Sequence, residues 1–252
     1  MIRVKYQKSA DALFGWYLNR LFKKSFYAIW LQNDPPKLDP NLPLLLLPNH
    51  STWWDGFFAH LLTKKIFHRP IYLMMLQKQL AQNRFFSRVG AFSIDPSSAI
   101  AIRESLNYTV SILKSLDHPK PLICIFPQGV LAPWDQRPLG FKPGVEFVLA
   151  RYRKPLSLLF LGIKVEFLAQ QFPEVFFRFG TPRVISSPQE FDLTNFEREA
   201  ESVLNEMVSH IHLGKPCLQL FRGRQSVNET FGVLRKRFQR RFRVVKNVSA
   251  ET

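Results

Sequence analysis

Cysteine is scarce in this chain of 252 residues, which contains only Cys124 and Cys217. The two are far apart and fit neither a metal-binding nor a redox spacing, so no disulfide framework is expected and a reducing compartment is the simpler assumption. Long apolar runs are also missing, because nowhere do about 18 uninterrupted apolar residues occur to span a bilayer. The first ten residues lack the apolar core of a signal peptide. We therefore expect any membrane association to be peripheral, on a cytoplasmic face.

Acidic residues are few, since 19 Asp and Glu stand against 35 Lys and Arg, which gives a net charge of +16 and a pI near 10.1. This balance indicates an anionic partner, either nucleic acid or a membrane surface with acidic lipids. The 24 Phe and 5 Trp exceed the usual needs of a core of this size and favour the lipid–water boundary. No recognised DNA or RNA motif is present, so we expect a membrane partner and no nucleic acid.

The middle of the chain alternates between strand-like and helix-like segments, and this alternation predicts an α/β fold. The sheet should be mixed but mostly parallel and flanked by helices, with right-handed crossovers. Ligands bind beyond the carboxyl ends of the strands in sheets of this kind. The expected strands are 43–47, 71–76, 90–94, 121–126, 156–167 and 175–180, and the expected helices are 53–65, 78–88, 97–116, 144–153 and 194–210.

The amino-terminal segment has apolar residues at helical spacing between Asp11 and Leu31, interleaved with Arg20, Lys23 and Lys24. It predicts one long amphipathic helix or two short ones, serving either as an interfacial membrane anchor or as a helix packed on the domain. Residues 33–43 contain four prolines and form a connector. We expect membrane-associating helices at 1–40, a central domain at 41–214 and a basic helical tail at 215–252.

The carboxyl-terminal tail is strongly basic and carries an apolar stripe, which predicts a basic amphipathic helix. Binding to an anionic membrane surface is favoured, and the alternative is a solvated helix docked by its stripe. The stripe consists of Phe231, Leu234, Phe238, Phe242 and Val245.

A histidine and an aspartate five residues apart, His50 and Asp55, directly follow the four leucines 44–47 and Pro48. The leucines predict a strand buried on both faces, and Ser51 or Thr52 can cap a helix that begins near Trp53. A separation of five places two side chains apart on one helix, so the pair can meet only across the turn between strand and helix. His50 would then act as a general base, with Asp55 fixing its tautomer.

The alternative for this pair is purely structural, with the two side chains capping a helix and bonding backbone groups. No Ser or Cys is evidently paired with His50, so the hydroxyl that it activates belongs to a substrate. A second motif, Phe126-Pro127-Gln128-Gly129, follows another predicted strand, and both motifs should converge at one edge of the sheet.

Together, His50-x4-Asp55 and Phe126-Pro127-Gln128-Gly129 resemble the N-H-x4-D and F-P-E-G blocks of the glycerolipid acyltransferase superfamily, the PlsC-like lysophospholipid acyltransferases. Residues 89–95 are similar to the second block of that family, and Lys142-Pro143-Gly144 is similar to the segment after its third. The likeness spans roughly 44–183. The resemblance implies that His50 and Asp55 are catalytic, that residues 126–129 and Lys142 bind substrate, and that no metal or cofactor is needed.

The resemblance also implies acyl donors that are thioesters of coenzyme A or acyl carrier protein, and a lipid hydroxyl as acceptor. Three positions depart from the family pattern: Gln128 replaces a glutamate, Val130 replaces Ser or Thr, and Pro96 stands where a basic residue usually ends the second block. These positions are associated with binding the acceptor, so glycerol phosphate is not assured as the acceptor group. Arg84, Arg88, Arg103, Arg137 or Lys142 can supply the missing cation. The rival to an enzyme is a membrane or lipid binder that keeps the fold without catalysis.

Overall fold

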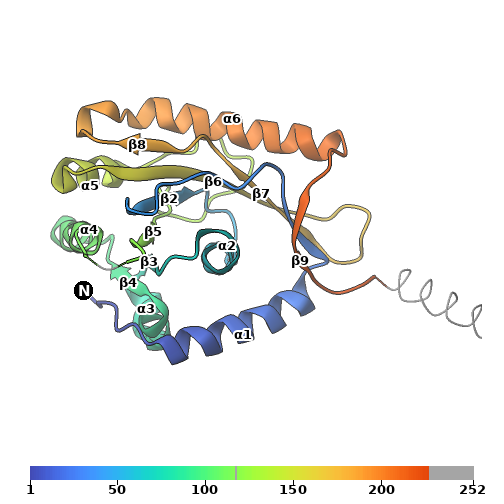
Figure 1. Ribbon diagram of the computed structural model, residues 1–252, viewed down its shortest axis with the longest axis horizontal. Helices are drawn as coiled ribbons and strands as arrows, with labels where there is room; N and C mark the ends of the chain where they lie inside the picture. The colour runs from blue at the N-terminus through green and yellow to red at the C-terminus, as the bar shows by residue number, and fades with distance from the viewer. Residues whose placement is uncertain (117, 227–252) are drawn as a thin grey trace, which may run out of the picture.

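The computed structural model describes residues 1–116 and 118–226, which form a nine-stranded sheet between layers of helices (Figure 1). The strands run in the order β4-β3-β5-β2-β6-β7-β1-β9, and β8 pairs with β6 beside this path. The strands are β1 (Ala28–Leu31), β2 (Leu44–Pro48), β3 (Ile71–Leu76), β4 (Ala91–Ile94), β5 (Leu122–Cys124), β6 (Leu156–Glu166), β7 (Glu174–Phe179), β8 (Arg183–Ile185) and β9 (Leu218–Arg222). The α-helices are α1 (Lys8–Ser25), α2 (Asp55–Leu62), α3 (Gln77–Gln82), α4 (Ala99–Leu113), α5 (Gly144–Tyr152) and α6 (Leu193–His212). Three shorter helical turns are η1 (Thr63–Phe67), η2 (Arg84–Val89) and η3 (Pro188–Glu190).

The sheet is mixed and mostly parallel, as the alternation of segments predicts. Strands β4, β3, β5, β2 and β6 are consecutive and run parallel to one another. Strands β7 and β8 are antiparallel to β6, while β1 is parallel to β7 and β9 is antiparallel to β1. The carboxyl ends of the five consecutive parallel strands therefore lie at one edge, and both predicted motifs follow strands of this group.

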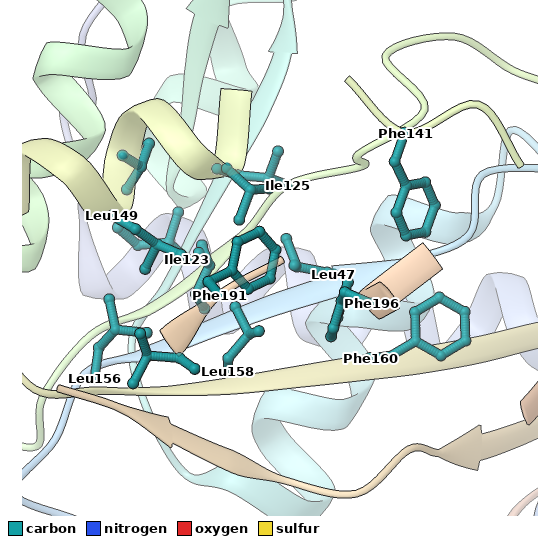
Figure 2. Packing of buried hydrophobic residues seen from close by; sticks show 14 of the residues in the cluster. Leu47, Ile123, Ile125, Phe141, Leu149, Leu156, Leu158, Phe160, Phe191 and Phe196 are labelled. Carbon is teal, nitrogen blue, oxygen red and sulfur yellow. The ribbon is translucent and has the colours of Figure 1, made fainter. Parts of the chain in front are cut away.

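Strand β2 is buried on both faces because helices cover both sides of the sheet. Leu45 and Leu47 pack into the cluster formed with α4, α5 and α6, part of which Figure 2 shows around Leu47, Ile123 and Leu158. Leu44 and Leu46 point to the opposite side and pack against α1 and α2. The four leucines thus contribute to both hydrophobic cores. Their packing fixes the point at which the chain leaves the sheet.

The amino-terminal helix is shorter than the pattern predicts. α1 ends at Ser25, Phe26 takes an extended conformation, and residues 28–31 form β1 instead of a further helical turn. One face of α1 packs on the domain through Phe14, Leu18 and Phe22, as one of the two predicted arrangements requires. No helix within 1–116 or 118–226 combines the length and the apolar character needed to cross a membrane.

The first part of the basic tail predicted at 215–252 is not helical. Residues 218–222 form β9, an edge strand that pairs with β1, so both segments placed outside the central domain contribute strands to its sheet. Gly223 passes so close to the residue after α1 that a Cβ there would lie 1.9 Å from the Phe26 carbonyl oxygen. The predicted basic helix and its apolar stripe lie outside the described residues.

A buried ionic cluster joins α1 to α2. The Asp11 carboxylate of α1 accepts hydrogen bonds from the Tyr6 hydroxyl at 3.0 Å and from His60 Nε2 at 2.8 Å, and it also pairs with the Lys64 ammonium. Burial alone would raise the pKa of Asp11, but the bonds from His60 and Lys64 outweigh it and hold this pKa well below its usual range. His60 is thus a packed histidine, and its role is to fix α1 on the helix that begins with Asp55.

The Asp11→Asn substitution should lower stability by about 2 kcal/mol at pH 7, the usual loss for a hydrogen-bonded charged group. The effect should shrink in acid. The folded-state pKa of Asp11 lies below the unfolded-state value of about 3.9, so its contribution is complete above that value and is lost as the pH falls towards the folded-state pKa. Urea denaturation of both proteins at pH 7, 5 and 3.5 measures this.

The control for Asp11→Asn is Asp34→Asn, which changes an exposed aspartate of the connector. The Asp34→Asn variant should have nearly the same stability as the native sequence at each pH. A destabilisation by Asp11→Asn that is equal at pH 7 and pH 3.5 would contradict the ionic role assigned to Asp11.

Candidate active site

The turn after β2 is held to the sheet by the side chain of Asn49. Asn49 Oδ1 accepts the Ile163 N–H at 2.7 Å, and Asn49 Nδ2 donates to the Ile163 carbonyl at 3.1 Å. The side chain thus bonds both main-chain groups of Ile163 just beyond the last paired residue of β2. The backbone is free to leave the sheet at this point, and the next residue is His50.

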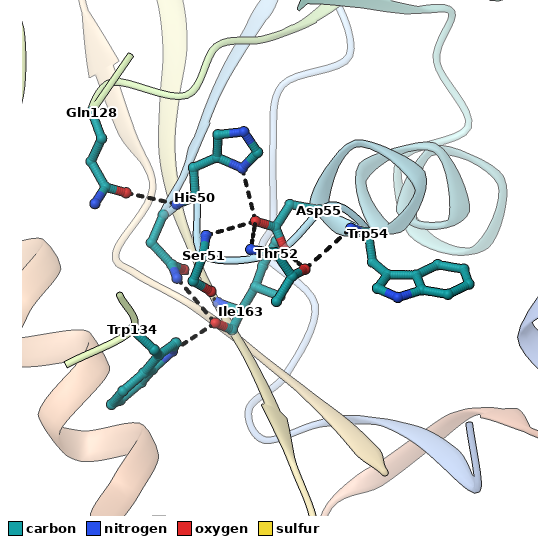
Figure 3. A network of polar contacts seen from close by, with 9 residues as sticks. His50, Ser51, Thr52, Trp54, Asp55, Gln128, Trp134 and Ile163 are labelled. Atoms are coloured by element: carbon teal, nitrogen blue, oxygen red, sulfur yellow. Dashed lines mark hydrogen bonds and ion pairs between the residues drawn. The ribbon is translucent and has the colours of Figure 1, made fainter. Parts of the chain in front are cut away.

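His50 and Asp55 meet across the turn, as their spacing predicts. Nδ1 of His50 lies 2.9 Å from Oδ2 of Asp55, which is the first residue of α2 (Figure 3). The same carboxylate accepts the N–H groups of Ser51 and Thr52 at 2.8 and 2.9 Å and the Thr52 hydroxyl at 2.6 Å. Four donors therefore hold a carboxylate that is fully buried.

The start of α2 differs from the expected cap. Its N-cap residue is Trp54, and no side chain caps it. The Thr52 hydroxyl accepts the Trp54 N–H at 3.2 Å while donating to Asp55, so Thr52 supports the aspartate instead of the helix end. The structural alternative for the pair is correct in one respect, because Asp55 does bind backbone N–H groups. It does so while also holding the imidazole.

The second motif lies directly against the first. The Gln128 side chain accepts the His50 N–H at 2.6 Å, and the ring of Phe126 stacks on the His50 ring with centroids 4.0 Å apart. The Ala132 N–H donates to the His50 carbonyl at 2.9 Å. Two segments about 75 residues apart in the sequence thus form one site, as the parallel strands predict.

The geometry fixes the tautomer of His50. A carboxylate only accepts hydrogen bonds, so Nδ1 carries the proton towards Asp55 and Nε2 presents a lone pair. The His50 side chain keeps 22% of its surface accessible, whereas that of Asp55 keeps none. This arrangement suits a base that meets a ligand on one side and a fixed negative charge on the other.

The nearby Cys124 is not a nucleophile. It is fully buried in β5, and burial, assisted by the negative charge of Asp55, raises the pKa of its thiol far above the usual range. Burial therefore keeps the Cys124 thiol from attacking a substrate.

The other predicted binding residues lie around the second motif. The Lys142 N–H donates to the Pro127 carbonyl at 2.8 Å, and its side chain passes beside Gly129, where an added Cβ would lie 3.6 Å from Lys142 Cγ. Gly129 has a φ of +71°, and its N–H donates to the Phe126 carbonyl at 3.0 Å. This turn is tight, and the Gly129 N–H is already used within it.

The side chains that could supply a cation lie in different parts of the structure. Arg137 donates to the Trp134 and Gln136 carbonyls and lies 5.4 Å from the Trp134 ring centre. Arg103 lies over the ring of Phe147. Of the five, Lys142 is the one whose main chain bonds the second motif. The block at 89–95 ends on β4, which β3 and β5 separate from β2.

The sequence did not predict two contacts of the site. One is the pairing of Asn49 with Ile163, and the other is made by Trp134 in the loop between β5 and α5. Trp134 Nε1 donates to the same Ile163 carbonyl at 2.8 Å, and Lys164 lies 4.0 Å from the centre of its ring (Figure 3). Within the described residues no group of three His, Cys, Asp or Glu side chains is placed to hold a metal ion.

Three comparisons place this geometry among known proteins. The Acyltransferase family model matches residues 32–157, which is half of the chain and includes both motifs. The 1-acyl-sn-glycerol-3-phosphate acyltransferase of Streptococcus pneumoniae is 31% identical over 98 residues, covering 37% of this chain and 33% of that protein. The match thus spans about a third of the length of the curated relative.

The crystal structure of the 1-acyl-sn-glycerophosphate (LPA) acyltransferase PlsC from Thermotoga maritima has a similar fold. The TM-score is 0.51 with 14% sequence identity, over 81% of this chain and 79% of that one. This likeness supports the fold, while the family model covers His50, Asp55 and the second motif. On these findings, the chain belongs to the acyltransferase family.

Proposed function

We propose that this protein transfers a fatty acyl group from an acyl thioester to the hydroxyl of a lysophospholipid or a related lipid. The observation that carries the proposal is the bond from His50 Nδ1 to the buried Asp55 carboxylate, which leaves Nε2 as the basic nitrogen of a partly accessible side chain. Coenzyme A or acyl carrier protein is the carrier of the acyl group.

In the proposed reaction, the acceptor hydroxyl binds to His50 Nε2 and attacks the thioester carbonyl carbon. A C–O bond forms, the hydroxyl proton passes to Nε2, and Asp55 stabilises the resulting imidazolium. The tetrahedral intermediate then collapses with cleavage of the C–S bond, and the departing sulfur takes up the proton. Because a thiolate leaves readily, one base serves the whole reaction.

Phe126 and Gln128 position the base in this proposal. The Phe126 ring covers one face of the imidazole, and Gln128 holds the His50 N–H, so the base is fixed through both its ring and its main chain. The Gln128 side chain is almost fully buried, and its oxygen faces His50. Its amide can do this without the negative charge that a glutamate would bring.

The acceptor is proposed from the relatives and from the charges beside the site. The relatives from S. pneumoniae and T. maritima are acyltransferases for 1-acylglycerol phosphate by name. Lys142 lies beside Gly129 and supplies a cation for a phosphate or another anionic head group.

The His50→Ala substitution should lower acyl transfer at least about 100-fold, because a positioned base typically contributes a factor of 100 to 10,000. Asp55→Asn should cause a similar loss, since the neutral amide no longer stabilises the imidazolium. Transfer of a radiolabelled acyl group to lysolipid measures both, and binding of the variants to vesicles should be unchanged.

The matched control for His50→Ala is His60→Gln, which alters the other buried pair of histidine and aspartate while keeping a donor towards Asp11. It should keep acyl transfer within about twofold when assayed below its melting temperature. Full activity in a folded His50→Ala protein would remove the proposed base, and a native protein without any transfer would favour the non-catalytic lipid binder.

We also propose that the protein works on the cytoplasmic face of a membrane with anionic lipids, bound through α1. The outer face of this helix exposes Leu13, Trp16 and Tyr17, while Arg20 and Lys24 are exposed on the same helix. Apolar side chains next to cations are typical of helices that lie in an anionic interface.

Replacing Leu13 and Trp16 together by Ser should weaken binding to anionic vesicles at least about tenfold, because each large apolar side chain that enters the interface contributes roughly 1.5–3 kcal/mol. Both side chains face away from the core, so the variant should fold normally. Vesicle sedimentation measures the affinity. The control is Leu213→Ser at the end of α6, whose side chain is similarly exposed; an equal loss in this variant would argue against a specific role of α1.

A further inference from the structure

Two arginines from neighbouring helices lie over one phenylalanine ring. The guanidinium of Arg103 on α4 is 6.0 Å from the centre of the Phe147 ring, and that of Arg151 is 5.4 Å from the same centre. Phe147 and Arg151 are four residues apart on α5, so they share one face of that helix. Contacts of this kind hold a cation in a fixed place at the surface. We name these three residues the arginine surface.

Neither arginine of this surface is neutralised by an acid. Arg103 and Arg151 are both exposed, and neither forms an ion pair with any residue of 1–116 or 118–226. Arg178 and Arg183, by contrast, pair with glutamates of α6. The charges around α6 are thus balanced within the protein, whereas the arginine surface keeps two fixed positive charges for a partner.

The chain around α5 adds further positive charge. Glu104, the acid next to Arg103, lies 3.8 Å from the ammonium group of Met1. Like charges gathered on one face attract an oppositely charged protein and orient it before contact. Residues 142–154 contain the single acid Glu146 and four cations, which are Lys142, Arg151, Arg153 and Lys154.

Helix α5 leads directly away from the candidate active site. The Lys142 N–H bonds the Pro127 carbonyl of the second motif, and α5 starts two residues later at Gly144. A Cβ at Gly144 would lie 3.5 Å from Leu106 of α4, so the two helices approach each other closely at this point. Arg151 lies about 10 Å further along α5, at 1.5 Å per residue. A partner on the arginine surface is therefore near enough to extend a flexible arm to His50.

The arginine surface lies on the side of the sheet opposite α1. Helices α4 and α5 pack into one hydrophobic cluster, and α1 packs into the other (Figure 1). With α1 on the membrane as proposed, the arginine surface faces water. Small ligands are usually held in concave sites, whereas arginines exposed on two helices suit the broad face of a protein.

We infer that the arginine surface docks a small acidic acyl carrier protein, whose phosphopantetheine arm brings the acyl thioester to His50. This inference rests on the proposed acyl transfer and selects one of the two donors named there. Acidic side chains of the carrier protein contact Arg103 and Arg151, and the ring of Phe147 supplies an apolar contact between them. The thioester then reacts as proposed above, and the carrier protein leaves with a free thiol on its arm.

Two donors with the same acyl group test the docking. In Arg103→Glu/Arg151→Glu, the KM for palmitoyl-acyl carrier protein should rise at least about tenfold with kcat within about twofold, because like charges now face the acidic partner. The KM for palmitoyl-CoA should stay within about twofold, since coenzyme A lacks the protein face. Arg103→Gln/Arg151→Gln, which removes the charges without reversing them, should give a smaller rise for the carrier protein.

The control is Lys37→Glu/Arg198→Glu, which makes the same change in net charge at exposed positions elsewhere. It should leave both KM values unchanged, and an equal rise in this variant would overturn the inference. An equal rise for both donors in the Arg103/Arg151 variant would place the arginines at the shared arm and would also overturn it. Unchanged KM values together with weaker binding to anionic vesicles would assign this surface to the membrane and refute docking of a protein.

Binding without reaction separates the inference from the proposed function. Acyl carrier protein that bears no acyl group should bind the native protein in surface plasmon resonance and should lose at least about tenfold in affinity for Arg103→Glu/Arg151→Glu. A native protein that does not bind the carrier protein would overturn the inference. Binding that depends on both arginines, without acyl transfer from either donor, would refute the proposed function alone.

Discussion

The buried carboxylate of Asp55 is the group on which the site depends. It takes up four hydrogen bonds from the turn that precedes it, and one of the donors is the imidazole of His50. A charge that is removed from water is tolerated only when its oxygens are bonded, so the turn must adopt this shape for Asp55 to be buried at all. The same bonds that satisfy the charge also orient the ring. Folding of the turn and orientation of the imidazole are therefore one process.

The sheet brings the second motif to this turn by its topology. Strands β2 and β5 are adjacent and parallel, so the segments after them emerge at the same edge. Gln128 and Phe126 then hold the main chain and the ring of one residue. The helices support the site indirectly. Helix α2 begins at Asp55, and it is anchored to α1 through the bond between His60 and Asp11. The apolar face of α1 is thus attached to the element that carries the aspartate.

Much of the fold follows from the sequence because the buried strands are short, continuous apolar runs. The leucines 44–47 and the segment 71–76 identify β2 and β3 nearly to the residue. β1 was missed because residues 28–31 continue the helical spacing of α1, and it is the pairing with β7 and β9 that makes them a strand. β9 is a mostly exposed edge strand in a basic stretch and has little local signal. In the site, the spacing of His50 and Asp55 and the ends of the parallel strands predict the convergence. The Asn49, Ile163 and Trp134 contacts depend on partners more than 25 residues apart, which no local pattern reveals.

The pairing of Asn49 with Ile163 has one more consequence. The position before His50 needs a donor and an acceptor on one short side chain, so an aspartate, which offers acceptors alone, would leave the Ile163 carbonyl without this donor. That carbonyl also receives the indole of Trp134, so the strand end and the overlying loop share a single oxygen. Any movement that lifts the loop from β6 must break a bond at the same peptide that fixes the approach to His50. The oxygen of Ile163 thus couples the loop that carries Trp134 to the residue that precedes His50.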